Sequence, residues 1–268
     1  MTTPAPVGES LPSVLAFTVR DKARELFRRS FTRRRTRLQL VRTAEAADRA
    51  LRAALVDAVV VDVCAGGEEA WTVAAMAREL PSIPFFALAA PRLADAPVFG
   101  RCAALDVADL LVEGVDDAAL RELVMPQAFT ARFAAALHGA HAALGLDAPL
   151  QQRAWEHIVA SGGRQVRTDA IAEALAVTRE HLSRSFAAEG APNLKRVIDL
   201  VRLIAAAELA KNPGFDLADV ARVLGFASPS HLANTAERVA GIRAASLTRL
   251  RTRDLLARFR QGRSRSRD

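Results

Sequence analysis

Two stretches in the second half of the chain repeat one pattern about fifty residues apart. The first is LAVTREHLSRSFAAEG, Leu175 to Gly190, and the second is LGFASPSHLANTAERVAG, Leu224 to Gly241. Matching residues are offset by 49 positions before the central turn and by 50 after it, where His181 meets His231. Each copy predicts a short helix, a tight turn and a second helix. We therefore expect two copies of one helical unit in this half of the chain.

The order helix, tight turn, helix is that of a helix-turn-helix, whose second helix lies in the major groove of DNA. In the first copy, Leu182 and Phe186 are four residues apart and predict the buried side of the second helix. The opposite side carries Arg179, Glu180, Ser183 and Arg184. An arginine can bond guanine O6 and N7 together, and a glutamate can accept from cytosine N4. This side is the candidate base-reading surface, with Arg184 and Glu180 as its readers.

An apolar helix-forming stretch, NLKRVIDLVRLIAAAELAK, joins the two copies over residues 193–211. A helix of about 17 residues spans about 25 Å. A rigid helix of that length can hold two reading helices in successive major grooves, which repeat every ~34 Å. We expect Asp216 to cap the helix that follows and Gly225 to supply the second turn.

Residues 150–250 resemble the AraC/XylS family of bacterial transcription regulators. The resemblance rests on the recognition helix HLSRSF, the long helix, and the segment DLADVARVLGFASPSHL, in that order. It implies a seven-helix DNA-binding domain that reads asymmetric sites in adjacent major grooves. It also implies activation of transcription, often as a dimer formed through the partner domain.

The family's base-reading positions fall on three residues in each recognition helix. They are Glu180, Ser183 and Arg184 in the first, and Ser230, His231 and Asn234 in the second. The second copy departs from the family pattern, because Asn234 stands where an arginine is expected and Ala236 where an aromatic residue is expected. Glu237 replaces a basic residue. We therefore expect the second helix-turn-helix to bind DNA weakly or mostly through phosphates. For His181 and His231, the alternative interpretation is that they pack against other helices or contact the backbone.

The first half of the chain alternates short apolar runs with helical stretches. The runs at residues 13–19, 36–43, 57–63, 83–90 and 108–114 predict five strands. Five strands that alternate with helices predict a doubly wound parallel sheet. Their spacing resembles the receiver domain of bacterial response regulators, and in that resemblance Asp62 occupies the phospho-acceptor position. The carboxyl end of a strand is where open α/β sheets present their sites.

The groups that must assist phosphoryl transfer are missing from the matching positions. Mg²⁺ needs adjacent carboxylates, and a hydroxyl and a lysine must contact the phosphoryl oxygens. Thr18 and Val19 replace the acidic pair, Ala89 replaces the hydroxyl, and Glu113 lies near the lysine position. We therefore expect a pseudo-receiver that is not phosphorylated at Asp62. The alternative role for Asp62 is a cap of the turn after its strand.

Charge is divided unevenly along the chain. Residues 1–125 hold 16 basic and 17 acidic residues, whereas residues 126–268 hold 21 and 13. The stretch from Arg249 to Asp268 has eight arginines and two aspartates, which suggests phosphate contacts, and its end QGRSRSRD has the composition of a disordered terminus. We expect reduced thiols at Cys64 and Cys102 rather than a disulfide or metal pair. His138 and His141 lack a third ligand, so no metal is expected.

These patterns divide the chain into five parts. They are a flexible N-terminus (1–12), a receiver-like α/β domain (13–125), a helical linker (126–149), a double helix-turn-helix domain (150–250) and an Arg-rich tail (251–268). We predict a sequence-specific DNA-binding transcription regulator of the bacterial cytoplasm and nucleoid, with no cofactor, no membrane span and no enzymatic activity. Its partners would be double-stranded DNA, RNA polymerase, and a second copy bound through the N-terminal domain or linker helix. The alternative is a protein-interaction module or anti-activator that no longer binds DNA specifically.

Overall fold

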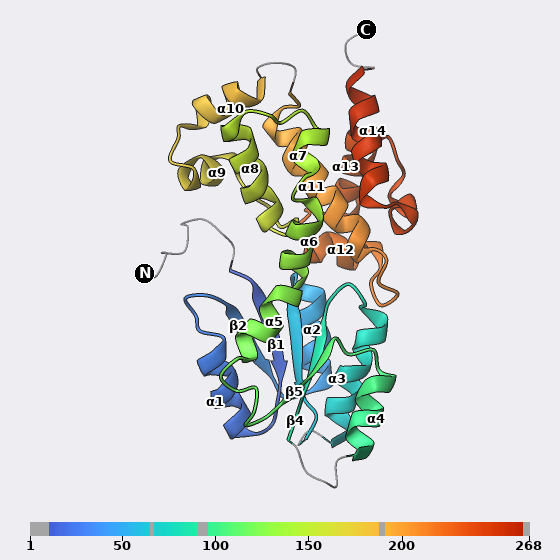
Figure 1. Ribbon diagram of the computed structural model, residues 1–268. Helices are drawn as coiled ribbons and strands as arrows, with labels where there is room; N and C mark the ends of the chain where they lie inside the picture. Colours follow the sequence, from blue (N-terminus) through green and yellow to red (C-terminus); the bar gives the residue numbers. More distant parts are fainter. Residues whose placement is uncertain (1–10, 65–66, 91–95, 188–190, 265–268) are drawn as a thin grey trace. The chain divides into compact units, whose positions relative to one another are not determined.

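The computed structural model describes residues 11–64, 67–90, 96–187 and 191–264. These residues form two compact units: residues 11–131 with Asn212–Phe215, and the remainder from Arg132 onward. The first unit is α/β and the second is all helical (Figure 1). The linker expected over residues 126–149 contains a 3₁₀ turn and two helices, most of which group with the helical unit.

Five parallel strands form the sheet of the α/β unit in the order β2-β1-β3-β4-β5. They are β1 (Ser13–Phe17), β2 (Arg37–Val41), β3 (Ala58–Asp62), β4 (Phe85–Ala89) and β5 (Asp109–Val112). Every residue of β3 and β4 is buried, as befits central strands covered on both faces. The predicted doubly wound parallel sheet is confirmed. Its strand order is the flavodoxin-like order that receiver domains use.

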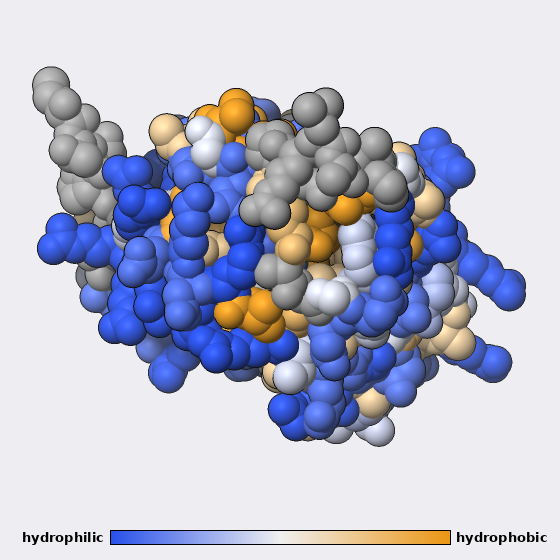
Figure 2. Space-filling view, turned by 90° about the horizontal axis from the view of Figure 1, so that it is seen from below, coloured by the Kyte–Doolittle hydropathy of each residue, from blue (hydrophilic) through white to orange (hydrophobic). Residues whose placement is uncertain are grey.

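Helices cover both faces of this sheet. They are α1 (Asp21–Ser30), α2 (Ala44–Ala53), α3 (Gly67–Glu79), α4 (Ala96–Ala104) and α5 (Leu120–Val124). Leu26 and Phe27 of α1 and Leu120 and Val124 of α5 pack in one apolar cluster with alternate strand residues such as Val60. The helices α2, α3 and α4 lie on the other side of the sheet (Figure 1). Figure 2 shows the lower face of the molecule, where hydrophilic side chains cover most of the surface and apolar residues form small patches.

The helical unit is built around one long buried helix. Its elements are α6 (Phe129–Leu137, which begins in the first unit), α7 (Ala140–Ala143), α8 (Pro149–Ala160), α9 (Thr168–Ala174), α10 (Arg179–Ala187), α11 (Leu194–Leu209), α12 (Leu217–Val223), α13 (Pro229–Ala240), the 3₁₀ turn η4 (Ala244–Arg249) and α14 (Thr252–Ser264). Of the 16 residues of α11, 13 are buried, so this helix is the core of the unit. It packs against α8, α12, α13 and α14.

The end of the chain differs from the sequence expectation. The Arg-rich stretch folds into α14 as far as Ser264, and residues 265–268 lie outside the described residues. Leu255 and Phe259 are fully buried and four residues apart, so they fix one side of α14 against the unit. Composition alone suggested disorder at residues 261–264 because arginine, serine and glycine dominate there. The two apolar anchors lie just upstream of that segment.

Candidate functional site

The first helix-turn-helix is formed by α9 and α10. Ala176 lies in the turn with a φ of 55°, a left-handed conformation for a residue with a side chain. The Oγ1 atom of Thr178 accepts a hydrogen bond of 3.1 Å from the backbone N–H of His181, so Thr178 caps α10. Leu182 and Phe186 are fully buried. This packing holds α10 by one side and leaves its opposite side to solvent.

The predicted readers of α10 lie on that free side. Arg179, Glu180, Ser183 and Arg184 are all exposed, and so is His181. The guanidinium of Arg184 makes one long hydrogen bond of 3.4 Å, from Nε to the backbone carbonyl of Glu180. Such a contact is weak, so the Arg184 fork remains available to an external acceptor. Exposure on one helix side is what major-groove readers require.

The second helix-turn-helix repeats the geometry of the first. Gly225, at the position of Ala176 after an offset of 49, has a φ of 67°. The Oδ1 atom of Asp216 accepts a 2.7 Å hydrogen bond from the backbone N–H of Asp219 and caps α12. The Oγ atom of Ser228 accepts a 3.0 Å bond from His231 N–H and caps α13. Both predictions, the Asp216 cap and the Gly225 turn, are confirmed.

The readers assigned to α13 are also on its exposed side. Ser230, His231 and Asn234 are exposed, whereas Leu232 and Val239 on the other side are buried. Ala236, which stands where the resemblance expects an aromatic residue, is fully buried. The imidazole of His231 lies edge-on to Phe226, with ring centroids 5.6 Å apart. His231 therefore packs against the turn and is exposed at the same time.

A buried arginine of α11 holds the second turn. Arg202 is 6% exposed, and its Nη2 donates to the backbone carbonyls of Leu224 and Gly225 at 3.1 and 3.2 Å. Its guanidinium lies 3.9 Å from the centre of the Phe226 ring. Burial lowers the pKa of Arg202, but an arginine stays charged in proteins. Arg202 thus ties the core helix to the end of α12 and to the residue that touches His231.

A second cluster of charged side chains lies at the carboxyl ends of the strands. Asp62, at the end of β3, is fully buried. Its Oδ2 accepts 2.6 Å from Thr18 Oγ1 and 2.8 Å from Arg20 Nε, and its Oδ1 accepts 2.7 Å from Arg20 Nη2. The backbone N–H of Cys64 adds a long bond of 3.3 Å, so capping of the turn is a minor role for Asp62. Both carboxylate oxygens are engaged by one guanidinium.

Glu113 completes this cluster from the end of β5. Its carboxylate lies 2.6 Å from Arg20 Nη2 and 2.8 Å from Lys22 Nζ. Burial opposes ionisation of Glu113, but hydrogen bonds from Lys22 and Arg20 outweigh it and hold the pKa of Glu113 below its ordinary value. The pKa of Arg20 is raised, chiefly by its hydrogen bond to Asp62. Asp62, Arg20, Glu113 and Lys22 form a chain of alternating charge, here called the strand-end network.

A known protein family matches part of the second half of the chain. A model described as "Helix-turn-helix domain" matches residues 171–250, from within α9 to the end of η4. The match includes both turns and both candidate reading helices.

These residues form an AraC-type helix-turn-helix domain.

The matched helix-turn-helix domain indicates DNA binding in transcription regulation. The AraC-type domain is joined to a receiver-like α/β unit, which the strand order identifies. No curated protein matches the chain.

Three solved structures share low similarity with the chain. The receiver domain of a response regulator from Bacteroides fragilis covers 44% of this chain and 97% of its own, at 14% identity and a TM-score of 0.39. The phosphorylated cyanobacterial phytochrome response regulator RcpA covers 42% and 89%, at 16% identity and 0.36. Full-length FixJ from B. japonicum covers 87% and 98%, at 15% identity and 0.37.

Two residues that organise these sites were missed from the sequence. Arg20 follows β1 by three residues, and its role depends on a carboxylate 42 positions away. Arg202 is a single arginine inside the apolar run LVRLIAAAEL, and that isolation was a signal that it has a buried partner. Within the described residues, no three His, Cys, Asp or Glu side chains are grouped to hold a metal ion. No described helix combines the length and apolar character that a membrane crossing requires.

Proposed function

We propose that this chain is a sequence-specific DNA-binding regulator that reads bases chiefly with α10. The observation that carries the proposal is the pair of matched turns, each followed by a capped helix with its polar side exposed. Arg184 supports base reading by the first helix, because an exposed guanidinium can bond guanine bidentately. In the second helix Asn234 takes the place of an arginine, and His231 and Ser230 supply shorter donors.

A binding assay on DNA fragments tests this proposal. The purified full chain is mixed with genomic fragments at about 150 mM salt, where non-specific binding is weak. We expect a subset of fragments to shift at a protein concentration that leaves random fragments free. Equal affinity for all fragments, or none for any, would instead favour a protein-interaction module or anti-activator.

The receiver-like unit is proposed to work without phosphorylation of Asp62. Phosphoryl transfer needs a free carboxylate oxygen and a metal ion beside it. In this chain the Arg20 guanidinium binds both Asp62 oxygens, and Thr18 donates to one of them. A fixed positive charge thus neutralises Asp62 from within the protein.

Mass spectrometry after treatment with acetyl phosphate and Mg²⁺ tests this part. We expect no phosphoryl adduct on the chain, while a conventional receiver domain treated in parallel becomes modified. Stoichiometric modification of Asp62 would overturn the proposal for this unit without touching the DNA-binding proposal. A second copy and RNA polymerase are the proposed protein partners, and sedimentation of the full chain with and without its DNA fragments tests the first.

A further inference from the structure

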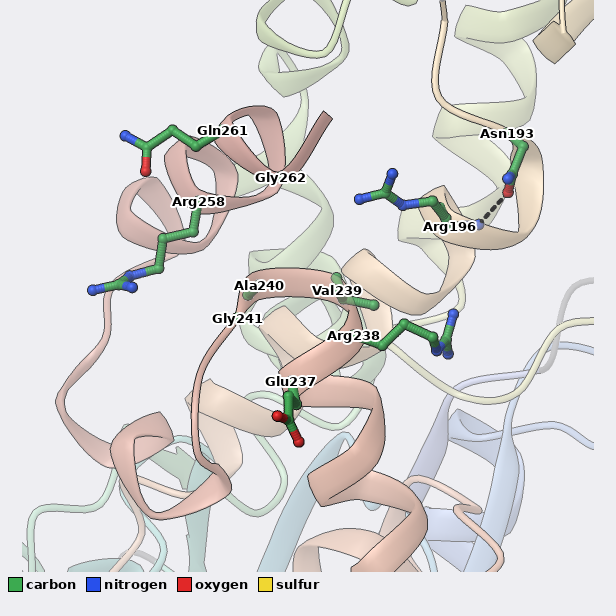
Figure 3. Close-up of a pocket in the computed structure, with 10 residues that line it drawn as sticks. All are labelled: Asn193, Arg196, Glu237, Arg238, Val239, Ala240, Gly241, Arg258, Gln261 and Gly262. Atoms are coloured by element: carbon green, nitrogen blue, oxygen red, sulfur yellow. Dashed lines mark hydrogen bonds between the residues drawn. The ribbon is translucent and has the colours of Figure 1, made fainter. Parts of the chain in front are cut away.

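A cavity of about 630 Å³ opens in the helical unit between the start of α11, the end of α13 and the outer half of α14 (Figure 3). Its polar lining consists of Asn193, Arg196, Glu237, Arg238, Arg258 and Gln261. We call it the arginine cleft. Its volume falls in the range of small-molecule sites, about 300–1,000 Å³. The family match ends at residue 250, so the side of the cleft formed by α14 lies outside the matched domain.

The three arginines of the cleft differ in how they are held. Arg238 is paired with Asp199 of α11 at 2.9 Å. The Arg196 guanidinium stacks over the buried ring of Phe259 at 5.0 Å and has no carboxylate partner in the described part of the chain. Arg258 is exposed and makes no hydrogen bond or ion pair within the described residues. Two guanidinium groups from different helices therefore border the cleft, and neither is paired with a carboxylate of the described residues.

The other charges of the cleft do not cancel these two. Glu237 is the acidic residue of the lining, and in Figure 3 its side chain points away from Arg196 and Arg258. The amino end of α11 faces the cleft with its partial positive charge, but the carboxyl end of α13 at Gly241 brings an opposite one. The two helix ends offset each other, so the arginines decide the sign of the site.

We propose that the arginine cleft binds a phosphate group. Arginine presents a planar fork of donors that matches phosphate oxygens, and two such forks with open space between them suit an anion with several oxygens. The contact with Phe259 restricts the Arg196 guanidinium, which reduces the entropy lost on binding. Among the described residues, Arg258 has no partner that it would lose on binding. The phosphate belongs either to a free phosphorylated small molecule or to the DNA backbone.

The cleft is separate from the residues that read bases. Ser230 and His231 lie in the first turn of α13, whereas Val239 to Gly241 at the other end of that helix line the cleft. A helix of this length spans about 18 Å. A ligand in the cleft therefore does not replace a base contact, and the two sites can be altered independently.

The test uses the full chain, inorganic pyrophosphate as probe, and two matched variants of α14. Arg258→Gln removes an unpaired arginine of the cleft. Arg260→Gln removes the same charge from an exposed position outside the lining. Calorimetric titration at constant ionic strength should show saturable binding of pyrophosphate to the wild type. We expect Arg258→Gln to weaken it about tenfold or more, as the loss of a charged hydrogen bond does, and Arg260→Gln to leave it within about twofold.

A second arm identifies the source of the phosphate. The affinity of a random 25-base-pair duplex is measured against salt concentration for the same three proteins. If the cleft holds the DNA backbone, Arg258→Gln lowers the slope of log K on log salt by about 1 relative to Arg260→Gln. If it holds a free ligand, only the pyrophosphate titration separates the two variants. The proposal is overturned if the two variants behave alike in both arms.

The two arms also keep this proposal apart from the proposed function. The duplex arm rests on DNA binding by the chain, whereas the pyrophosphate arm does not. A wild-type chain that binds no DNA would contradict the proposed function, and the pyrophosphate titration would still decide on the cleft. Arg196→Gln serves as a second cleft variant, provided that its melting temperature shows that loss of the Phe259 stack leaves the chain folded.

Discussion

Among single residues, Arg20 changes the chemistry of its site most. A receiver that takes up phosphate has negative charges after its first strand and a positive one after its fifth, and these signs are reversed here. Arg20 supplies the positive charge beside β1, and Glu113 supplies the negative one after β5. The strand-end network thus places ion pairs at Asp62, where a conventional receiver binds a metal ion. Such a set holds the strand ends together and needs no ligand.

Replacement of Arg20 by alanine should destabilise the α/β unit strongly. Asp62 is fully buried, and without Arg20 its charge would lose its main partner. Removal of one partner of a buried pair costs about 3 kcal/mol or more. Urea unfolding of the two proteins measures the loss. Lys22→Ala is the control, because Lys22 is 78% exposed in its pair with Glu113 and should cost less than about 1 kcal/mol. If both variants lower the unfolding free energy equally, the Arg20–Asp62 pair contributes no more stability than an exposed ion pair.

The two turn residues should respond in opposite directions to exchange of alanine and glycine. Ala176 has a φ of 55°, where a side chain costs about 1 kcal/mol relative to glycine. Ala176→Gly is therefore expected to raise the unfolding free energy by up to about 1 kcal/mol. Gly225→Ala should lower it by about 1 kcal/mol through backbone strain alone, since a Cβ there would meet no atom within 4 Å. Thermal unfolding of both variants decides, and a loss of stability in Ala176→Gly would contradict the account of the turn.

The two candidate reading helices, α10 and α13, have the same geometry but different chemistry. Both are capped by a hydroxyl and packed by leucine, and α10 carries arginine at the positions assigned to base reading. Helix α13 presents the smaller donors Ser230, His231 and Asn234. Specificity should therefore rest mainly on α10.

Arg184→Ala tests this division. If Arg184 bonds a guanine bidentately, the variant should lose about 1–3 kcal/mol of binding free energy at the selected site. Binding to the same site with that base pair changed should show little further loss. Fluorescence anisotropy with both duplexes and with random DNA gives the comparison. An equal loss on random DNA would mean that Arg184 contacts phosphate only.

Arg202 of α11 should stabilise the turn between α12 and α13. In Arg202→Met the carbonyls of Leu224 and Gly225 lose their buried donor, at a cost of about 2 kcal/mol. Hydrogen exchange should then quicken in the turn between α12 and α13 and stay unchanged between α9 and α10. Arg202→Lys keeps the charge without the planar fork, so its exchange rate in this turn should lie between those of the wild type and Arg202→Met. Uniform acceleration across the unit would argue that Arg202 supports the whole core instead.

Local patterns predicted the elements well, and long-range partners explain what they missed. The cap at Asp216 acts within three residues, so it can be predicted directly from the sequence. Helix α5 begins at Leu120, four residues after Asp116. The Asp116 carboxylate accepts from Val112 N–H at 2.6 Å and holds the preceding loop. Arg20 and Arg202 could not be assigned because their acceptors come from other elements, which only the fold brings near.

For the whole molecule, a receiver-like unit and an AraC-type helix-turn-helix domain share one chain. The formal charge of residues 126–268 is positive, and that half holds both the reading helices and the arginine cleft. The strand-end network neutralises Asp62 internally, so the chain is expected to bind its sites without a phosphate donor. In this respect the chain is expected to differ from a conventional response regulator, which is controlled by phosphorylation.

Selection of genomic fragments by the purified full chain, without any phosphate donor, tests sequence-specific DNA binding. Bound fragments are sequenced and compared with the input. We expect strong enrichment of a few fragments that share one asymmetric motif, and loss of that enrichment in Arg184→Ala. Recovery of fragments at their input frequencies, or enrichment that appears only after acetyl phosphate treatment, would contradict it.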